Sequence, residues 1–143
     1  MAKQLIDVGV SANDGTGDTL RSGAVKVNNN FDEVYSALES SFNITASGAS
    51  AYTFQADTRF FITNENNPVL YLQRGRTYNF IVNASGHPLE IRLSNGGAAY
   101  NTGVSNNADD AGTVIFTPTM SAPSTLYYQC TNHPAMGNTI NII

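Results

Sequence analysis

Four side chains in this sequence could bind one transition-metal ion together. The chain has a single cysteine, Cys130, and two histidines, His87 and His133, and the second histidine lies in the segment Cys-Thr-Asn-His-Pro-Ala-Met that ends at Met136. A thiolate, two imidazoles and a thioether are the ligand set of a mononuclear blue-copper site. The residue types and their spacing therefore predict a copper site made of His87, Cys130, His133 and Met136.

The spacing of these residues sets a requirement on the fold. A short loop that leaves one strand can bring Cys130, His133 and Met136 around one point, whereas His87 has to come from a different strand. The alternative interpretation is structural, because a lone cysteine or methionine commonly fills space in a hydrophobic core. Three scarce ligand types at a workable spacing favour the metal site.

Composition and charge exclude several classes of protein. With 143 residues, the chain has room for one domain, or for one domain and a short appendage. Its seven basic residues and net charge of −4 argue against nucleic-acid binding, which needs clustered lysine and arginine. No apolar run approaches the roughly 20 residues of a membrane span, and a single cysteine cannot form an internal disulfide.

From Tyr52 onward the sequence is typical of β-structure, since short β-branched or aromatic runs alternate with turn residues. The predicted strands are Tyr52–Gln55, Arg59–Thr63, Val69–Leu72, Thr77–Asn83, Leu89–Leu93, Thr113–Thr117, Thr125–Gln129 and Thr139–Ile143. About eight short strands in about 90 residues predict a mainly β fold, a two-sheet Greek-key sandwich. Residues 95–112 have no strand character and predict a long loop.

Residues 1–45 differ in character and predict a separate segment with one α-helix, at about residues 18–40, which Asp18 is placed to cap. Its apolar positions follow a heptad spacing: Leu20, Ala24, Val27, Phe31, Val34 and Leu38. Because such a helix is marginal alone in water, its apolar face packs either on its own sandwich or on other chains. The small and polar residues 43–50 predict a linker to a sandwich that occupies residues 46–143.

Other polar patterns favour structural roles. The hexapeptide 13–18 resembles a calcium loop without its closing glutamate, so a turn before the helix is favoured. Residues 106–110 could hold a cation, but a solvated loop tip is favoured. With both histidines assigned to the metal site, no hydrolytic triad is available, and we expect no catalytic residues and no enzymatic activity.

The segment 126–143, which contains Tyr-Tyr-Gln-Cys-Thr-Asn-His-Pro-Ala-Met-Gly, resembles the last two strands and the ligand loop of the cupredoxins. Its ligand spacing is similar to that of amicyanin. Over about residues 50–143, the resemblance implies a cupredoxin-like sandwich that binds one copper ion. The resemblance makes His87, Cys130 and His133 the planar ligands and Met136 the weak axial ligand.

One position departs from the cupredoxin pattern. In cupredoxins the residue after the first histidine donates its backbone N–H to the cysteine sulfur, but here that residue is Pro88, which has no N–H. Asn132 stands where amicyanin has a proline, and Asn132 can donate. The resemblance therefore implies a hydrogen bond moved to a different residue, which bears on the redox potential more than on binding.

Residues 8–35 carry the pattern N-D-G-T-G-D-x-L-R followed by K-x-N-x-N-F-x-E-x-Y. This pattern resembles a module at the N-termini of virion proteins of tailed phages, especially myoviruses that infect marine cyanobacteria. In such proteins the module is expected to anchor fibres or decorations, often as trimers.

Together the two resemblances imply a virion decoration or fibre protein, localised in the virion, which displays a cupredoxin-like domain. We expect homo-oligomers, trimers being favoured, and other virion proteins as partners of the N-terminal segment, with no nucleic-acid or membrane partner. The start of the chain, Met1–Asp7, lacks the apolar core of a secretory signal, which agrees with assembly in the cytoplasm of the infected host. The alternative is a small blue-copper electron-transfer protein.

Overall fold

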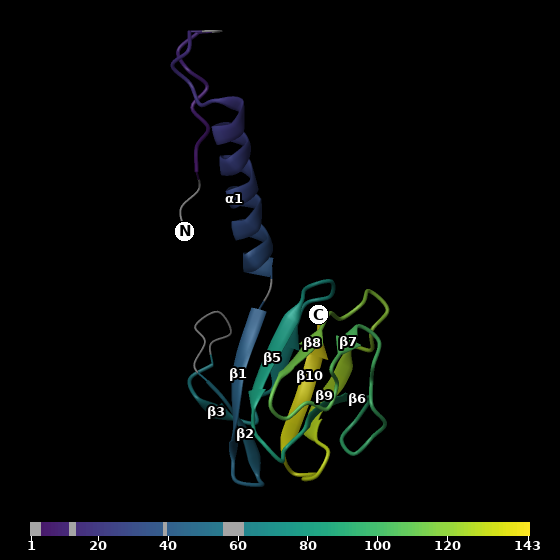
Figure 1. Cartoon of the computed structure of the whole chain (residues 1–143). Coiled ribbons are helices and arrows are strands. Elements are labelled where there is room, and N and C mark those ends of the chain that lie inside the picture. Colours follow the sequence, from purple (N-terminus) through teal and green to yellow (C-terminus); the bar gives the residue numbers. More distant parts are fainter. Residues whose placement is uncertain (1–3, 12–13, 39, 56–61) are drawn as a thin grey trace. The chain divides into compact units, whose positions relative to one another are not determined.

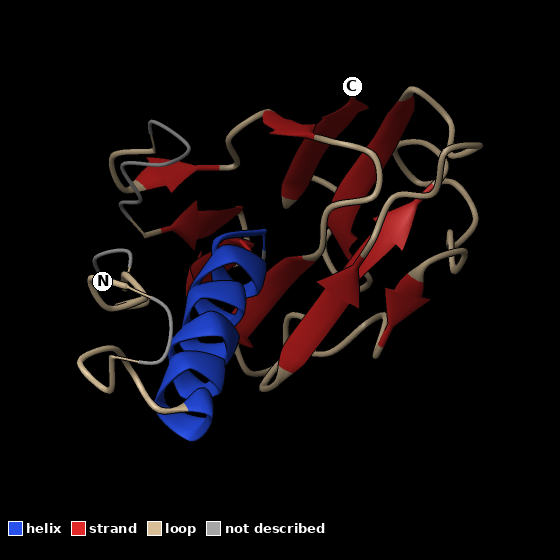
Figure 2. Cartoon of the chain, turned by 90° about the horizontal axis from the view of Figure 1, so that it is seen from above, coloured by secondary structure: helices blue, strands red, loops and turns tan. Residues whose placement is uncertain are grey.

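The computed structural model describes residues 4–11, 14–38, 40–55 and 62–143. It divides into two compact units, Met1–Leu38 and Glu39–Ile143. Within the described ranges, α1 (Leu20–Leu38) is the helix, and the other regular structure is β-strand, as Figure 2 shows. No helix in these ranges combines the length and the apolarity that crossing a membrane requires.

In the first unit, an extended segment runs back along α1 and is fixed to it by polar side chains. The Asn30 side-chain amide exchanges two hydrogen bonds with the backbone of Gln4, at 2.8 and 2.9 Å. The Lys26 ammonium donates to the carbonyl of Leu5 at 3.0 Å. Asparagine lowers helix propensity, and these contacts explain why Asn30 is nevertheless useful inside the helix.

The loop before α1 is organised around the carboxylate of Asp14. This carboxylate accepts backbone N–H groups from Val10 and Ser11 at 2.7 Å and from Thr16 at 2.9 Å. These hydrogen bonds, that from Thr16 first, hold the pKa of Asp14 well below its usual range. A carboxylate saturated in this way folds the turn, the role that the sequence favoured over calcium binding.

The predicted helix cap at Asp18 was wrong by one residue. Thr19 is the cap, because its Oγ1 accepts the N–H of Ser22 at 3.1 Å. The Asp18 carboxylate is used elsewhere: it accepts the N–H of Asp7 at 2.8 Å and binds the Lys26 ammonium at 2.6 Å. The hydrogen bond from Lys26, followed by that from Asp7, lowers the pKa of Asp18.

Much of the apolar face of α1 is exposed within the first unit. Leu20 is 92% exposed, and Phe31 and Val34 are each 56% exposed. The side chain of Leu38, the last heptad position, lies outside what the structure describes. The helix that the heptad spacing predicted is therefore present, with an apolar surface available for association.

The second unit is a sandwich of two sheets (Figure 1). One sheet has the strand order β3 (Glu65–Asn66), β2 (Ala51–Phe54), β1 (Ser40–Ser47), β5 (Tyr78–Asn83), β8 (Thr113–Phe116) and β7 (Val104–Ser105). The other has the order β4 (Leu70–Leu72), β10 (Gly137–Ile142), β9 (Thr125–Cys130) and β6 (Leu89–Arg92). Neighbouring strands are antiparallel except for β1 with β5 and β4 with β10. The mainly β, two-sheet architecture is confirmed.

The predicted linker at residues 43–50 was wrong, because most of it belongs to β1. This strand pairs with β5 in parallel, beginning with Ser40 opposite Tyr78. The alternating side chains of Phe42 and Ile44 are buried, which holds β1 in the sheet. The sandwich therefore begins at Ser40, earlier than the predicted boundary at residue 46.

The long loop predicted at residues 95–112 contains one short strand, since β7 pairs with the edge of β8. The predicted strand at residues 59–63 falls largely outside the described residues. The other predicted strands coincide with observed ones, and their ends differ by at most two residues. Alternation of apolar residues therefore located most of the sheet correctly.

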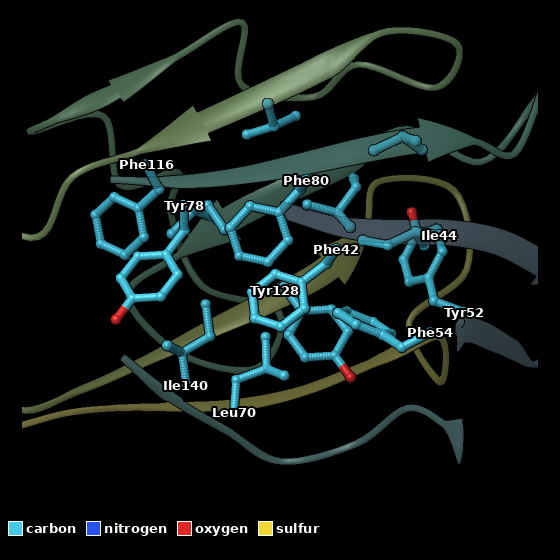
Figure 3. Packing of buried hydrophobic residues seen from close by; sticks show 14 of the residues in the cluster. Phe42, Ile44, Tyr52, Phe54, Leu70, Tyr78, Phe80, Phe116, Tyr128 and Ile140 are labelled. Atoms are coloured by element: carbon cyan, nitrogen blue, oxygen red, sulfur yellow. The ribbon is translucent and has the colours of Figure 1, made fainter. Parts of the chain in front are cut away.

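Aromatic side chains from both sheets fill the space between them. Figure 3 shows Phe42, Phe54 and Tyr128 close together in this space. The ring centroids of Phe42 and Phe54 lie 5.6 Å apart in an edge-on arrangement, and those of Phe54 and Tyr128, which belongs to the other sheet, lie 5.1 Å apart. The buried Tyr128 hydroxyl donates to the carbonyl of Pro68 at 2.7 Å. This core fixes the two sheets against each other and so positions the strand ends that carry the predicted ligands.

Candidate metal centre

The four predicted ligands lie at one end of the sandwich. His87 belongs to the connection between β5 and β6, whereas Cys130 is the last residue of β9. The pairing of β6 with β9 places Leu89 directly opposite Cys130, which brings the two segments together. His133 and Met136 follow in the loop that leads to β10. Different strands thus supply His87 and the loop that starts at Cys130, as the spacing requires.

The structure brings three ligand groups together. His87 Nδ1 lies 3.0 Å from His133 Nδ1, and Cys130 Sγ lies 3.5 Å from the same His133 atom. One ligand atom of each residue lies within 4.8 Å of the others. Cys130 is only 2% exposed, while the two histidines are half-buried. The sulfur is therefore shielded from water, whereas the imidazoles are partly open to it.

Met136 is buried in the same loop. Its N–H donates to the carbonyl of His133 at 2.9 Å, and its carbonyl accepts the N–H of Cys130 at 2.8 Å. Its side chain is part of the hydrophobic core. The backbone of Met136 therefore shapes the ligand loop, and the thioether as axial ligand stays a prediction.

The two separations that involve His133 Nδ1 suit a single metal ion. Bonds of about 2.0 Å to nitrogen and about 2.3 Å to sulfur, roughly 110° apart, put two nitrogens about 3.3 Å apart and a nitrogen and a sulfur about 3.5 Å apart. The observed separations of 3.0 and 3.5 Å are close to these values. Thiolate and imidazole ligands suit copper or zinc, whereas magnesium and calcium prefer oxygen ligands.

The sulfur of Cys130 accepts a hydrogen bond from its own loop. The backbone N–H of Asn132 donates to Cys130 Sγ at 3.4 Å. Pro88 has no N–H to offer, and its carbonyl accepts the N–H of Thr131 at 3.1 Å. Asn132 therefore supplies the donor that Pro88 lacks, at the position that the sequence indicated.

Tyr52, on β2 of the opposite sheet, supports the segment that carries His87. Its buried hydroxyl donates to the backbone carbonyl of His87 at 2.7 Å. Burial first, and then the nearby sulfur of Cys130, raise the pKa of Tyr52, so the phenol remains a protonated donor. Sequence reasoning missed this residue, because no spacing relates a strand so distant along the chain to the ligands.

Two hydrogen bonds to the backbone of Gly86 hold the turn before His87. Asn132 Nδ2 donates to the carbonyl of Gly86 at 2.9 Å, and the Gly86 N–H donates to the Asp110 carboxylate at 2.7 Å. Gly86 has a φ of 80°, which favours glycine at this turn. Asp110, one of the acidic residues considered for cation binding, therefore serves to shape the turn that presents His87.

Comparison with known proteins identifies the family. Residues 3–126 match the family described as the N-terminal domain of bacteriophage T4 gp9/10-like proteins. The chain belongs to this family. The match includes His87 but ends before Cys130, so membership by itself carries no information about three of the four predicted ligands. Baseplate wedge protein gp10 of Enterobacteria phage T4 is 56% identical over 36 residues, which are 25% of this chain and 6% of that protein.

Solved structures of rusticyanin and amicyanin are similar to the chain at low sequence identity. Rusticyanin from Thiobacillus ferrooxidans is 20% identical, with a TM-score of 0.46 over 73% of this chain and 77% of that one. A reduced amicyanin variant is 19% identical, with a TM-score of 0.41 over 72% of this chain and 82% of that one. The second unit, with two sheets and a His/Cys/His group at one end, is a cupredoxin-like sandwich. The predicted phage module followed by such a sandwich is confirmed.

Proposed function

We propose that this protein is a decoration or fibre protein of a tailed-phage virion, whose first unit attaches it to other virion proteins. The observation that carries the proposal is the family match over residues 3–126. The similarity to a protein named for the baseplate wedge supports it. Because the chain covers only 6% of that protein, we propose attachment to the particle and not the relative's whole role.

The exposed face of α1 supports self-association through the first unit. Leu20, Phe31 and Val34 are exposed within the first unit and follow the heptad spacing. An amphipathic helix of this kind gains most of its stability when that face is buried. We therefore propose a homo-oligomer built on α1, with a trimer as the favoured state.

The sandwich is proposed to hold one copper ion through His87, Cys130, His133 and Met136. Three of these residues present ligand atoms within 4.8 Å of one another, and the two separations to His133 Nδ1 suit one ion. Bound copper would supply one-electron redox chemistry. The protein's own residues would orient the imidazoles and shield the sulfur from water. We propose no enzymatic role, because both histidines of the chain belong to this group.

Location and metal content test the two parts of this function separately. Purified virions are expected to contain the chain in fixed stoichiometry, and His133→Ala is expected to leave its incorporation unchanged. Cu(II) added to the reduced protein is expected to give an intense visible thiolate-to-copper band, which Cys130→Ser abolishes. Absence of the chain from purified particles would overturn the structural role, whereas a colourless protein after anaerobic loading would overturn the copper site.

The surface around His133 favours electron transfer as a second candidate function. His133 is half-buried, and the adjacent Pro134 and Ala135 are exposed, so an electron-transfer partner could approach the imidazole edge. Such a carrier would be found free in host lysate and reduced by photosynthetic donors. Particle association without such reduction favours the structural role.

A further inference from the structure

Gln129, the residue before the cysteine of the metal group, is a buried amide on the outer face of its sheet. Leu126, Tyr128 and Cys130 of β9 contribute to the core, so strand alternation turns Gln129 to the opposite face. Gln129 is nevertheless only 3% exposed. A polar group buried to this extent needs hydrogen-bond partners.

The Gln129 amide joins two loops. Its Oε1 accepts the N–H of Gly96 at 2.7 Å, and its Nε2 donates to Asn95 Oδ1 at 2.6 Å. Nε2 also donates to the carbonyl of Pro134, next to His133, at 2.5 Å. The Gly96 N–H can only donate and the Pro134 carbonyl can only accept, so the amide is held in one orientation.

The two residues that follow His133 have little other support from side-chain packing, although Met136 after them is buried in the core. Pro134 and Ala135 are both exposed. A hollow of about 110 Å³ lies against these two residues and Gln129, so no side chain fills the space on that side. Hydrogen bonds therefore fix this stretch, and the bond from Gln129 reaches it from a rigid strand.

We propose that Gln129 is a positioning residue for His133. By donating to the Pro134 carbonyl, it holds the loop so that the His133 imidazole faces His87 and Cys130 before metal arrives. The proposal rests on the metal-binding function proposed above. Partners outside the ligand set that orient metal ligands typically change metal affinity about 10- to 100-fold when they are removed.

Two variants of the full chain separate the Pro134 contact from the rest of the network. Gln129→Glu keeps the size and the acceptor oxygen but cannot donate, and it sets a carboxylate against the Pro134 carbonyl. Asn95→Ala is the matched control, because it removes one partner of Nε2 and leaves Gly96 and Pro134 in place.

The first measurement needs no metal. Hydrogen exchange of the Met136 amide, which donates to the His133 carbonyl, reports on the order of the ligand loop. We expect Gln129→Glu to speed this exchange about tenfold and Asn95→Ala to change it less than about threefold. The second measurement is Cu(II) release to excess EDTA, followed by the visible band, which Gln129→Glu is expected to speed about tenfold.

Equal exchange and release rates in Gln129→Glu and Asn95→Ala would overturn the positioning role. An unchanged Met136 exchange rate in folded Gln129→Glu would overturn it as well. If Gln129→Glu does not fold, Gln129→Asn, whose shorter amide cannot span the same partners, is measured in the same way. A wild-type chain that takes up no Cu(II) would refute the proposed metal site. The exchange measurement would then still decide whether Gln129 orders the loop.

Discussion

The Nδ1 atoms of His87 and His133 lie 3.0 Å apart, although 46 positions separate the two residues in the chain. At this distance a neutral imidazole that carries its proton on Nδ1 can donate to the other Nδ1, and a metal ion that binds both nitrogens would take the place of that proton. The fold therefore holds the two ring nitrogens where one proton or one metal ion can lie between them.

Metal binding is expected to stabilise the folded protein. At a free metal concentration one hundred times the Kd, the added stability is about 2.7 kcal/mol. Calorimetry with and without Cu(II) should show a higher Tm in wild type, and Cys130→Ser should lose most of the increase. A metal-induced increase of the same size in Cys130→Ser would place the ion elsewhere.

Tyr52→Phe is expected to destabilise the sandwich. The substitution removes the donor to the carbonyl of the half-buried His87, and the loss of this hydrogen bond should cost about 0.5–1.5 kcal/mol. Tyr71→Phe is the matched control, because Tyr71 is 63% exposed and its hydroxyl should contribute little. Urea unfolding of the full chain measures the stability of both variants. Equal unfolding midpoints for Tyr52→Phe and Tyr71→Phe would contradict the role of Tyr52 in holding the His87 segment.

Truncation tests the boundary between the two units. A chain without residues 1–38 is expected to remain a folded monomer with the near-ultraviolet circular dichroism of the sandwich. A chain without residues 1–45 loses most of β1, which pairs with both β2 and β5, and should unfold or aggregate. A folded, soluble product from the longer deletion would show that β1 is dispensable. A shorter truncation that stays oligomeric would place the association surface in the sandwich.

The loop before α1 is expected to loosen in acid. The folded-state pKa of Asp14 lies below the unfolded value, so its contribution to stability is present at neutral pH. That contribution is lost as the pH falls below about 4 towards the folded-state pKa. Amide exchange of Val10, Ser11 and Thr16 should therefore lose protection at low pH. Asp14→Asn should remove that protection at neutral pH, whereas Asp32→Asn on the exposed helix surface should not.

Two glycines of the first unit are expected to respond oppositely to alanine. Gly23 lies inside α1, and an added Cβ would make an ordinary contact with Ile6 at 3.6 Å, so Gly23→Ala should stabilise the helix by about 0.5–1 kcal/mol. A Cβ at Gly17 would lie 2.7 Å from the carbonyl oxygen of Asp7, so Gly17→Ala should disrupt the loop. Far-ultraviolet circular dichroism during thermal unfolding compares them, and a less helical Gly23→Ala would contradict this account.

Much of the site could be predicted because its residue types are scarce. One cysteine and two histidines leave few combinations, and the structure brings Cys130, His87 and His133 together. Tyr52 and Gln129 could not be predicted as their partners. Their roles depend on contacts between different segments, which neither local periodicity nor spacing encodes.

The misplaced boundary has a local cause. The outward-facing positions of β1, such as Asn43 and Thr45, are polar and resemble a linker when they are considered together. The apolar residues Phe42 and Ile44 alternate with these polar residues, and this alternation is typical of a half-buried strand. The misplaced cap has a similar cause, since Asp18 and Thr19 are both good cap residues and only the contacts of Asp18 with Lys26 and the extended segment decide between them.

The direct succession of α1 and β1 has a mechanical consequence. One residue, at position 39, lies between Leu38 and Ser40 in the sequence, so a force applied to α1 would reach β1 through very few covalent bonds. β1 lies inside its sheet and pairs with β5 over six successive positions from Ser40 to Thr45. A pull along β1 from an anchored helix would load these hydrogen bonds in shear, so that several must break together instead of unzipping one by one.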